Sequence, residues 1–234
     1  MAPASAANRG SPAALLPYDL GQALSRLHAQ ISSCRRCVEA GQLDRAFPIL
    51  PAPVGAAIVL VGQAPGRVEE VAGRPFSGRA GRLLFRWLAT AGLGDEESAR
   101  RTIYLTSITK CFPGAAPSGS GDRRPSSLEV RLCRDHLDLQ LGLVRPWLVL
   151  TVGQMALERF LGPLPMHLAV GQVFGSDGTR CDPGTARAAG LRPLLLPLPH
   201  PSGASRWLNA PDHRALLERA LGALRELCRA GSDS

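Results

Sequence analysis

The chain has 234 residues, 45% of them hydrophobic, and carries 27 Lys and Arg against 19 Asp and Glu, a formal net charge of +8. This length fits one α/β domain with a full core, which excludes wholesale disorder and leaves little room for two independent cores. The longest apolar runs fall far short of the roughly 20 residues that cross a bilayer, so we exclude a transmembrane protein. The positive balance favours a polyanionic partner such as nucleic acid, although charge alone does not prove one.

The chain has six cysteines, and its start lacks the basic and apolar pattern of a secretory signal. We therefore expect a cytoplasmic, prokaryotic protein that associates with the nucleoid, in which clustered cysteines indicate metal or redox chemistry rather than disulfides. Residues 1–17 are rich in Ala, Pro, Ser and Gly, which predicts a flexible leader. We expect one folded domain over residues 18–228 and a flexible tail over 229–234.

The first half of the chain predicts two helices and two strands. Leucines at helical spacing predict helices over Tyr18–Ser33 and Ala80–Ala91, the second ending at Gly92. Short runs rich in β-branched residues predict buried strands over Ala56–Gly62 and Thr102–Ile108.

The second half continues the alternation of strands and helices. Ser126 and Ser127 offer caps to a helix that runs through Leu141, with Glu129 in its first turn. The following elements are a strand over Trp147–Val152, a helix over Gly153–Leu161, a strand over Leu194–Leu198 and an amphipathic helix over Pro211–Cys228. This order predicts a single α/β domain with a central parallel four-stranded sheet flanked by helices.

Two segments do not fit that alternation. Pro113–Pro125 and Gly175–Gly190 are loops by composition, and loops of this length in a compact domain are either functional or disordered. We expect Cys181, in the second loop, to be a free surface thiol and Cys228 to pack on the last helix.

Small and polar residues follow each predicted strand. They are Gln63–Gly66, Ser107 with Lys110 and Cys111, Gly153 with Gln154, and His200–Ser202. Ligands of parallel sheets bind beyond the carboxyl ends of the strands, so we expect the site there. Gly and Pro also punctuate ordinary strand ends, which leaves a purely structural role open for each residue taken singly.

Three motifs carry a family resemblance. Val61–Gly81 (VGQAPGRVEEVAGRPFSGRAG) resembles the first motif of the uracil-DNA glycosylase superfamily, in particular its iron-sulfur, family-4 type. Tyr104–Cys111 resembles that family's second strand and cysteine, and Pro199–Trp207 resembles its His-Pro-Ser motif. The resemblance covers roughly residues 33–227 and implies the fold. It also implies a monofunctional DNA-repair N-glycosylase that flips uracil or another deaminated base out of DNA and hydrolyses its N-glycosidic bond.

Four cysteines match the cluster ligands of that family: Cys34, Cys37, Cys111 and Cys133. Four thiolates can hold a [4Fe-4S] cluster, and they equally suit one tetrahedral zinc ion. Spacing alone leaves zinc and iron-sulfur open, and the resemblance favours the cluster.

The resemblance also assigns the base pocket. Phe76 is the aromatic side chain that stacks on the base, and Gly62, Ala64 and Ser107 lie around it. His200 resembles the histidine beside the O2 oxygen of the base, where it can stabilise negative charge on the departing uracil. Gln63 is expected to position the attacking water.

The chain departs from the family pattern at two positions. Gln63 replaces a glutamate, and an amide can orient water but cannot accept its proton. Ser107 replaces an asparagine that reads the uracil edge, leaving one hydroxyl where an amide offered both donor and acceptor. Glu69 and Glu70 are the nearest carboxylates in sequence and could supply the missing charge, with a solvated loop role as the alternative.

DNA contacts are expected from Arg123, Arg124, Ser202 and Arg206, with Trp207 available for stacking, in a monomeric protein. A different class stays open: an iron-sulfur DNA-binding protein of this fold that recognises lesions or single strands with little or no glycosylase activity. A third interpretation takes VGQAPG as the phosphate turn of a nucleotide-binding or hydrolytic enzyme. The absence of a Walker Lys-Ser/Thr pair argues against that enzyme.

Overall fold

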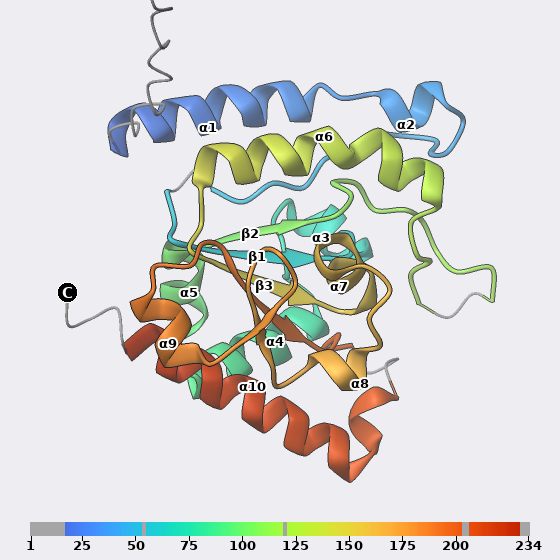
Figure 1. Ribbon diagram of the computed structural model, residues 1–234. Helices are drawn as coiled ribbons and strands as arrows, with labels where there is room; N and C mark the ends of the chain where they lie inside the picture. The colour runs from blue at the N-terminus through green and yellow to red at the C-terminus, as the bar shows by residue number, and fades with distance from the viewer. Residues whose placement is uncertain (1–16, 53–54, 119–120, 203–205, 230–234) are drawn as a thin grey trace, which may run out of the picture.

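The computed structural model describes residues 17–52, 55–118, 121–202 and 206–229 (Figure 1). Residues 1–16 of the predicted leader and 230–234 of the predicted tail lie outside the described residues. The remaining residue of each, Pro17 and Arg229, belongs to a helix instead, α1 and α10. The elements are α1 Pro17–Ser32, α2 Arg36–Glu39, β1 Ile58–Gly62, α3 Arg67–Ala72, α4 Arg79–Thr90, α5 Glu96–Thr102, β2 Ile103–Ser107, α6 Ser127–Val144, β3 Leu148–Val152, α7 Gln154–Leu161, α8 Met166–Ala169, β4 Val173–Phe174, β5 Arg180–Cys181, α9 Pro183–Ala188, β6 Leu194–Leu198, a 3-10 turn Trp207–Asn209 and α10 Pro211–Arg229.

The sheet contains six strands in the order β2-β1-β3-β6-β4-β5. Strands β2, β1, β3 and β6 are parallel neighbours and coincide with the four predicted strands. The expectation of a four-stranded sheet was nevertheless wrong, because β4 and β5 extend it as antiparallel edge strands. Each has only two residues, too few to show the alternation by which a strand is recognised in sequence.

The predicted loop Gly175–Gly190 therefore contains structure. It includes β5 and α9, whose first turn is capped by the Asp182 carboxylate, 3.0 Å from the Thr185 amide nitrogen. Cys181 lies half-buried on β5, not on an open loop, and its thiol donates a hydrogen bond to the Thr179 carbonyl at 3.4 Å. Cys228 packs against the core, as predicted.

Each face of the sheet is covered by helices. Alternate residues of a strand point to opposite faces, so Ile58 and Leu60 pack in one cluster with α4 and α10. Val59 and Val61 pack in the other cluster with α1, α6 and α7. Figure 1 shows α1 and α6 stacked on one side of the sheet and α4 and α10 on the other. None of the described helices combines the length and apolar composition that crossing a membrane requires.

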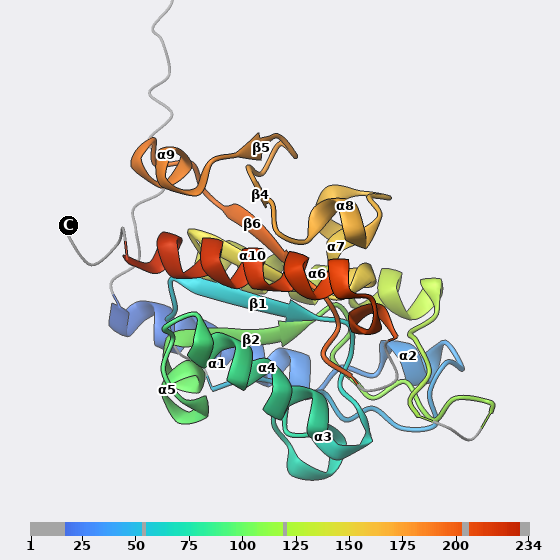
Figure 2. The ribbon, with the colours of Figure 1, turned by 90° about the horizontal axis from the view of Figure 1, so that it is seen from below.

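The carboxyl ends of the parallel strands meet at one edge of the sheet. Figure 2 shows the heads of β1 and β6 pointing toward the side that carries the segment after β2 and the start of α10. The sequence motifs that follow the strands therefore lie at a common edge.

Candidate functional site

The turn after β1 is held by a buried carboxylate. Glu69, in the first turn of α3, accepts hydrogen bonds from the amides of Gly66 at 3.0 Å and Gly78 at 2.9 Å. Glu70 accepts two hydrogen bonds from the Arg45 guanidinium, at 3.1 and 2.7 Å. The solvated loop role considered for Glu69 and Glu70 was thus wrong, because both lie in α3 and are engaged. Glu69 joins the two ends of the motif.

Phe76 lies in the turn between α3 and α4 with a φ of 54°, a backbone conformation that is costly for a residue other than glycine. The Arg100 guanidinium holds this turn by donating to the carbonyls of Pro75 at 2.8 Å and Phe76 at 3.0 Å. A Cβ atom on Gly62 would come 2.8 Å from the Phe76 ring, so only glycine lets the ring lie against the end of β1. The predicted stacking residue is therefore at the strand ends.

His200 follows β6, and its imidazole rests on the glycine after β3. A Cβ atom on Gly153 would approach the ring within 3.2 Å, and Gly153 has a φ of 86°. The Ser202 amide donates to His200 Nδ1 at 3.2 Å. Burial, with a smaller contribution from the Arg124 charge, lowers the His200 pKa below its ordinary value. The imidazole is therefore neutral near pH 7, with Nδ1 as acceptor and the proton on Nε2.

Ser107 ends β2 with its hydroxyl turned toward its own loop, where it donates to the Thr109 carbonyl at 2.7 Å. The Thr109 amide donates in turn to the Gln63 carbonyl at 3.2 Å, so the ends of β1 and β2 are tied together. The side chains of Gln63 and Ala64 are half-buried at the same edge. The hydroxyl proton of Ser107 is committed, and its oxygen is left as an acceptor.

Lys110, the only lysine of the chain, is fully buried in the segment that follows β2. Its ammonium donates to Thr106 Oγ1 at 2.9 Å, and burial lowers its pKa to about 8. Thr106 donates to Gln140, Gln140 donates to the Tyr104 hydroxyl, and that hydroxyl lies 2.7 Å from His28 Nε2. The sequence analysis assigned this network no role. A single lysine in a chain with 26 arginines, placed directly before a cysteine, is the feature that could have indicated a special role for Lys110.

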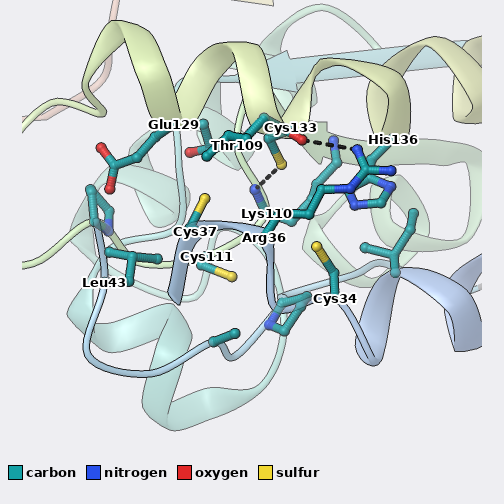
Figure 3. A pocket seen from close by; sticks show the side chains of 15 residues that line it. Cys34, Arg36, Cys37, Leu43, Thr109, Lys110, Cys111, Glu129, Cys133 and His136 are labelled. Carbon is teal, nitrogen blue, oxygen red and sulfur yellow. Dashed lines mark hydrogen bonds between the residues drawn. The ribbon is translucent and has the colours of Figure 1, made fainter. Parts of the chain in front are cut away.

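Four cysteines from four segments line one cavity of about 430 Å³, including the part open to solvent. Figure 3 shows their sulfur atoms pointing into a shared space between α2, α6 and the chain after β2. They are the predicted ligands Cys34, Cys37, Cys111 and Cys133. Among the described residues, no three His, Cys, Asp or Glu side chains are arranged to hold a single metal ion.

The cavity is lined mainly by apolar atoms, among which the four thiols and two buried polar atoms stand. Burial is the main cause that raises the pKa of Cys37 to about 11 and that of Cys111 to about 12, with neighbouring cysteines adding to both. Thr109 Oγ1 and His136 Nε2 are buried in the cavity wall without a hydrogen-bond partner in the described part of the chain. The Lys110 amide donates to Cys133 Sγ at 3.3 Å.

The family profile of the uracil DNA glycosylase superfamily matches residues 50–225. The chain belongs to this superfamily. It is 36% identical over 140 residues to the Type-4 uracil-DNA glycosylase of Archaeoglobus fulgidus, covering 58% of this chain and 63% of that protein. The identity is 31% over 183 residues to the Type-4 protein of Pyrobaculum aerophilum, covering 78% and 85%, and 28% over 205 residues to that of Sulfurisphaera tokodaii, covering 87% and 84%.

In this member of the glycosylase superfamily, the adjacent Arg123 and Arg124 of the segment after β2 have different environments. Both terminal nitrogens of Arg123 lie 2.7 Å from the carboxylate of Glu129, whose side chain is 2% exposed and accepts from the Ser126 amide at the start of α6. The expectation that Arg123 contacts DNA does not fit this inward position. Arg124 is exposed.

In the segment after the His-Pro-Ser motif, too, one of two adjacent residues is engaged within the protein and the other is exposed. Trp207 stacks on His213 with ring centroids 4.2 Å apart and an interplanar angle of 12°, so one face of the indole is occupied. Arg206, directly before it, is exposed. Ser202 contributes its backbone amide to His200, as described above.

Proposed function

We propose that this chain is a monofunctional DNA N-glycosylase that excises uracil or another deaminated base from DNA for base-excision repair. The observation that carries the proposal is His200, a half-buried neutral imidazole whose Nδ1 accepts from Ser202, which leaves Nε2 as a donor at the strand ends. A fixed donor of this kind suits a reaction in which negative charge develops on a leaving base. The superfamily membership supports the same conclusion.

The reaction is the hydrolysis of the bond between C1′ of deoxyribose and N1 of the base. The bonding electron pair leaves with the base, and His200 Nε2 donates a hydrogen bond to the O2 atom on which charge accumulates. Removal of one such donor typically costs about 100-fold to 1,000-fold in rate. Water adds to C1′ while the Gln63 amide orients it, and the proton that the water loses passes to the uracil anion or to solvent, since the amide cannot accept it.

The flipped base needs an aromatic surface and a polar edge. Phe76 supplies the surface, since its ring lies over Gly62 in a turn that Arg100 holds. Ala64 lies beside it, and Ser107 offers its hydroxyl oxygen to an N–H group of the base. A single acceptor discriminates less sharply than an amide, which favours a broader choice of deaminated bases.

The phosphate backbone is proposed to contact Arg124, Ser202 and Arg206. The two arginines are exposed near His200 and the start of α10, and guanidinium groups bind phosphate in a bidentate manner. We propose that the protein acts as a monomer, since base flipping needs no second subunit, and that it works on DNA in the cytoplasm at the nucleoid.

We further propose that Cys34, Cys37, Cys111 and Cys133 hold a [4Fe-4S] cluster. The unpartnered donors Thr109 Oγ1 and His136 Nε2 fit a group whose sulfur atoms accept hydrogen bonds. Four thiols whose sulfur atoms point into a shared space supply the ligand set of such a cluster. When bound, the cluster supplies a cross-link between the N-terminal helices and the sheet.

One observation favours the alternative, an iron-sulfur DNA-binding protein with little or no glycosylase activity. Gln63 carries no charge, so it lacks the negative charge that a carboxylate would provide. The Ser107 hydroxyl proton is committed to Thr109, so Ser107 lacks the donor that an amide would provide.

The experiment that decides between the two functions uses anaerobically purified protein and oligonucleotides that contain uracil, hypoxanthine or xanthine, followed by alkali to cut abasic sites. We expect strand cleavage for the uracil substrate in single-turnover conditions and none for undamaged DNA. Tight binding of these oligonucleotides with every base left intact would favour the binding protein.

A further inference from the structure

The hydrolysis proposed above needs a negative charge near C1′ of the sugar, and this inference rests on that proposed function. Positive charge develops on the sugar ring as the base leaves, and an attacking water must lose a proton. The residues at the turn after β1 are neutral at positions 63 and 64. Glu69 is bound to two backbone amides and Glu70 to Arg45, so neither is available.

A carboxylate from a distant segment lies on this same turn. The Oδ2 atom of Asp122 lies 2.6 Å from the place that a Cβ atom on Gly66 would occupy. It lies 3.4 Å from the Arg67 amide nitrogen, a long and weak hydrogen bond. The side chain is exposed, and it forms no ion pair with any residue that the structure describes. Asp122 therefore carries a charge that the described fold does not neutralise.

The backbone around Asp122 explains this position. Asp122 forms an antiparallel bridge with Ala115, and the Arg123 amide donates to the Gly114 carbonyl at 3.0 Å. Side chains alternate along such extended backbone, and Arg123 points inward to Glu129. Asp122 faces the opposite way, toward the turn after β1.

The contacts of Asp122 agree with that direction, since its carboxylate meets the turn after β1, as described. The charge of Arg124 is in addition a smaller cause of the lowered pKa of His200. One short segment thus carries a carboxylate to the turn after β1 and a guanidinium toward the histidine after β6.

We propose that Asp122 is a catalytic carboxylate that takes the role Gln63 cannot fill. As the C1′–N1 bond breaks and its electron pair moves to the base, the Asp122 carboxylate stabilises the positive sugar. Water then forms its bond to C1′ and transfers a proton to Asp122, which completes the abasic site. The free carboxylate is restored when that proton passes to the uracil anion or to solvent.

The first test is Asp122→Asn, which keeps the shape of the side chain and its acceptor oxygen for Arg67 but removes the charge. We expect single-turnover cleavage of uracil-containing oligonucleotide to fall on the order of 100-fold, as for loss of a general base. Affinity for the uncleaved DNA should stay equal or become tighter, because a negative charge beside the phosphates is lost. Asp177→Asn is the matched control, since Asp177 is an exposed aspartate in the turn between β4 and β5, away from the strand ends.

The second test returns a carboxylate to the same turn. Gln63→Glu in the Asp122→Asn background should recover at least about tenfold in rate, since the introduced carboxylate would supply the missing charge. A slowed Asp122→Asn enzyme that Gln63→Glu does not recover would assign Asp122 to holding the turn and overturn the catalytic role.

The failures of the two proposals are distinguishable. An active wild-type enzyme whose rate is unchanged, within about twofold, by Asp122→Asn overturns this inference and leaves the glycosylase function standing. A wild-type protein that leaves uracil in DNA overturns both.

Discussion

The cysteine cavity differs from the proposed base-binding pocket at the strand ends in the kind of feature that forms it. The cavity contains four cysteines from α2, α6 and the segments that follow α1 and β2, and their residue type indicates a metal centre, zinc or iron-sulfur. The pocket depends on backbone conformation, on a strained turn at Phe76 and on contacts from α5 and the segment after β2. A metal centre can therefore be recognised from residue type and family pattern, whereas a pocket of this kind is visible only once distant segments are placed.

The largest effect should come from removing a cysteine of the cavity. Cys133→Ser is expected to abolish the iron content and to lower the free energy of unfolding by about 3–5 kcal/mol, the order for a cross-link that closes a long loop. Iron analysis and thermal unfolding of the anaerobic protein measure both.

Cys181→Ser is the control, since Cys181 lies on β5 outside the cavity. Stoichiometric zinc without iron in the wild-type protein, or full iron content in Cys133→Ser, would contradict the cluster assignment.

The next largest effect is expected on stability at Arg123. Arg123→Ala leaves the Glu129 carboxylate, 2% exposed, without its cation, and should destabilise the fold by about 2–3 kcal/mol after allowance for the partial exposure of the arginine. Chemical denaturation measures the change. An unchanged denaturation midpoint with weakened DNA binding would restore the original expectation that Arg123 contacts DNA.

Arg100→Gln separates positioning from binding in the pocket. It removes the hydrogen bonds that hold the strained turn at Phe76, so the single-turnover rate should fall about tenfold or more while DNA affinity changes little. Arg101→Gln, on the exposed side of the same helix, is the control and should cleave at the wild-type rate. Equal rates for both variants would show that Phe76 needs no such support.

A smaller effect is expected at Arg124. Arg124→Ala should weaken binding several-fold irrespective of DNA sequence and reduce the slope of log K against log salt by about 0.9, the value for one lost phosphate contact on duplex DNA. Titrations at several salt concentrations measure both quantities. An unchanged slope would remove Arg124 from the DNA surface.

The smallest effect concerns pH. Protonation of His200 Nδ1 would break its hydrogen bond from Ser202, so the cleavage rate should hold near pH 7 and decline only below the ordinary histidine pKa of 6.5. Because the Arg124 charge contributes to the lowered pKa, Arg124→Ala should move the acid limb to higher pH. A limb that moves to lower pH would contradict the sign of this interaction.

The predicted and observed structures differ at very short strands and at side chains whose partners lie far away in the sequence. The four parallel strands and the long helices followed from hydrophobic spacing, and the Ser126–Glu129 capping box followed from residue type. Strand β4 pairs with β6 through one register position and left no periodic signal. The sequence does not show which of the adjacent Arg123 and Arg124 points inward, because the two differ only in that Arg123 pairs with the buried Glu129.

The residues proposed to bind the base were predicted mainly from their motifs. The residues that hold them in position were not predicted. Glu69 looked like a solvated acid, yet its oxygens bind the amides of Gly66 and Gly78. Lys110 lies in the Tyr104–Cys111 motif and Asp122 in a predicted loop, but neither was given a role of its own, because the groups that they contact come from other segments.

The most direct test of the central claim compares the wild-type enzyme with His200→Ala on one uracil-containing oligonucleotide in single-turnover conditions, with DNA affinity measured in parallel. We predict that wild type releases uracil and that His200→Ala does so at least about 100-fold more slowly with nearly unchanged affinity. Equal cleavage rates for the two proteins would contradict the role of His200 in the reaction.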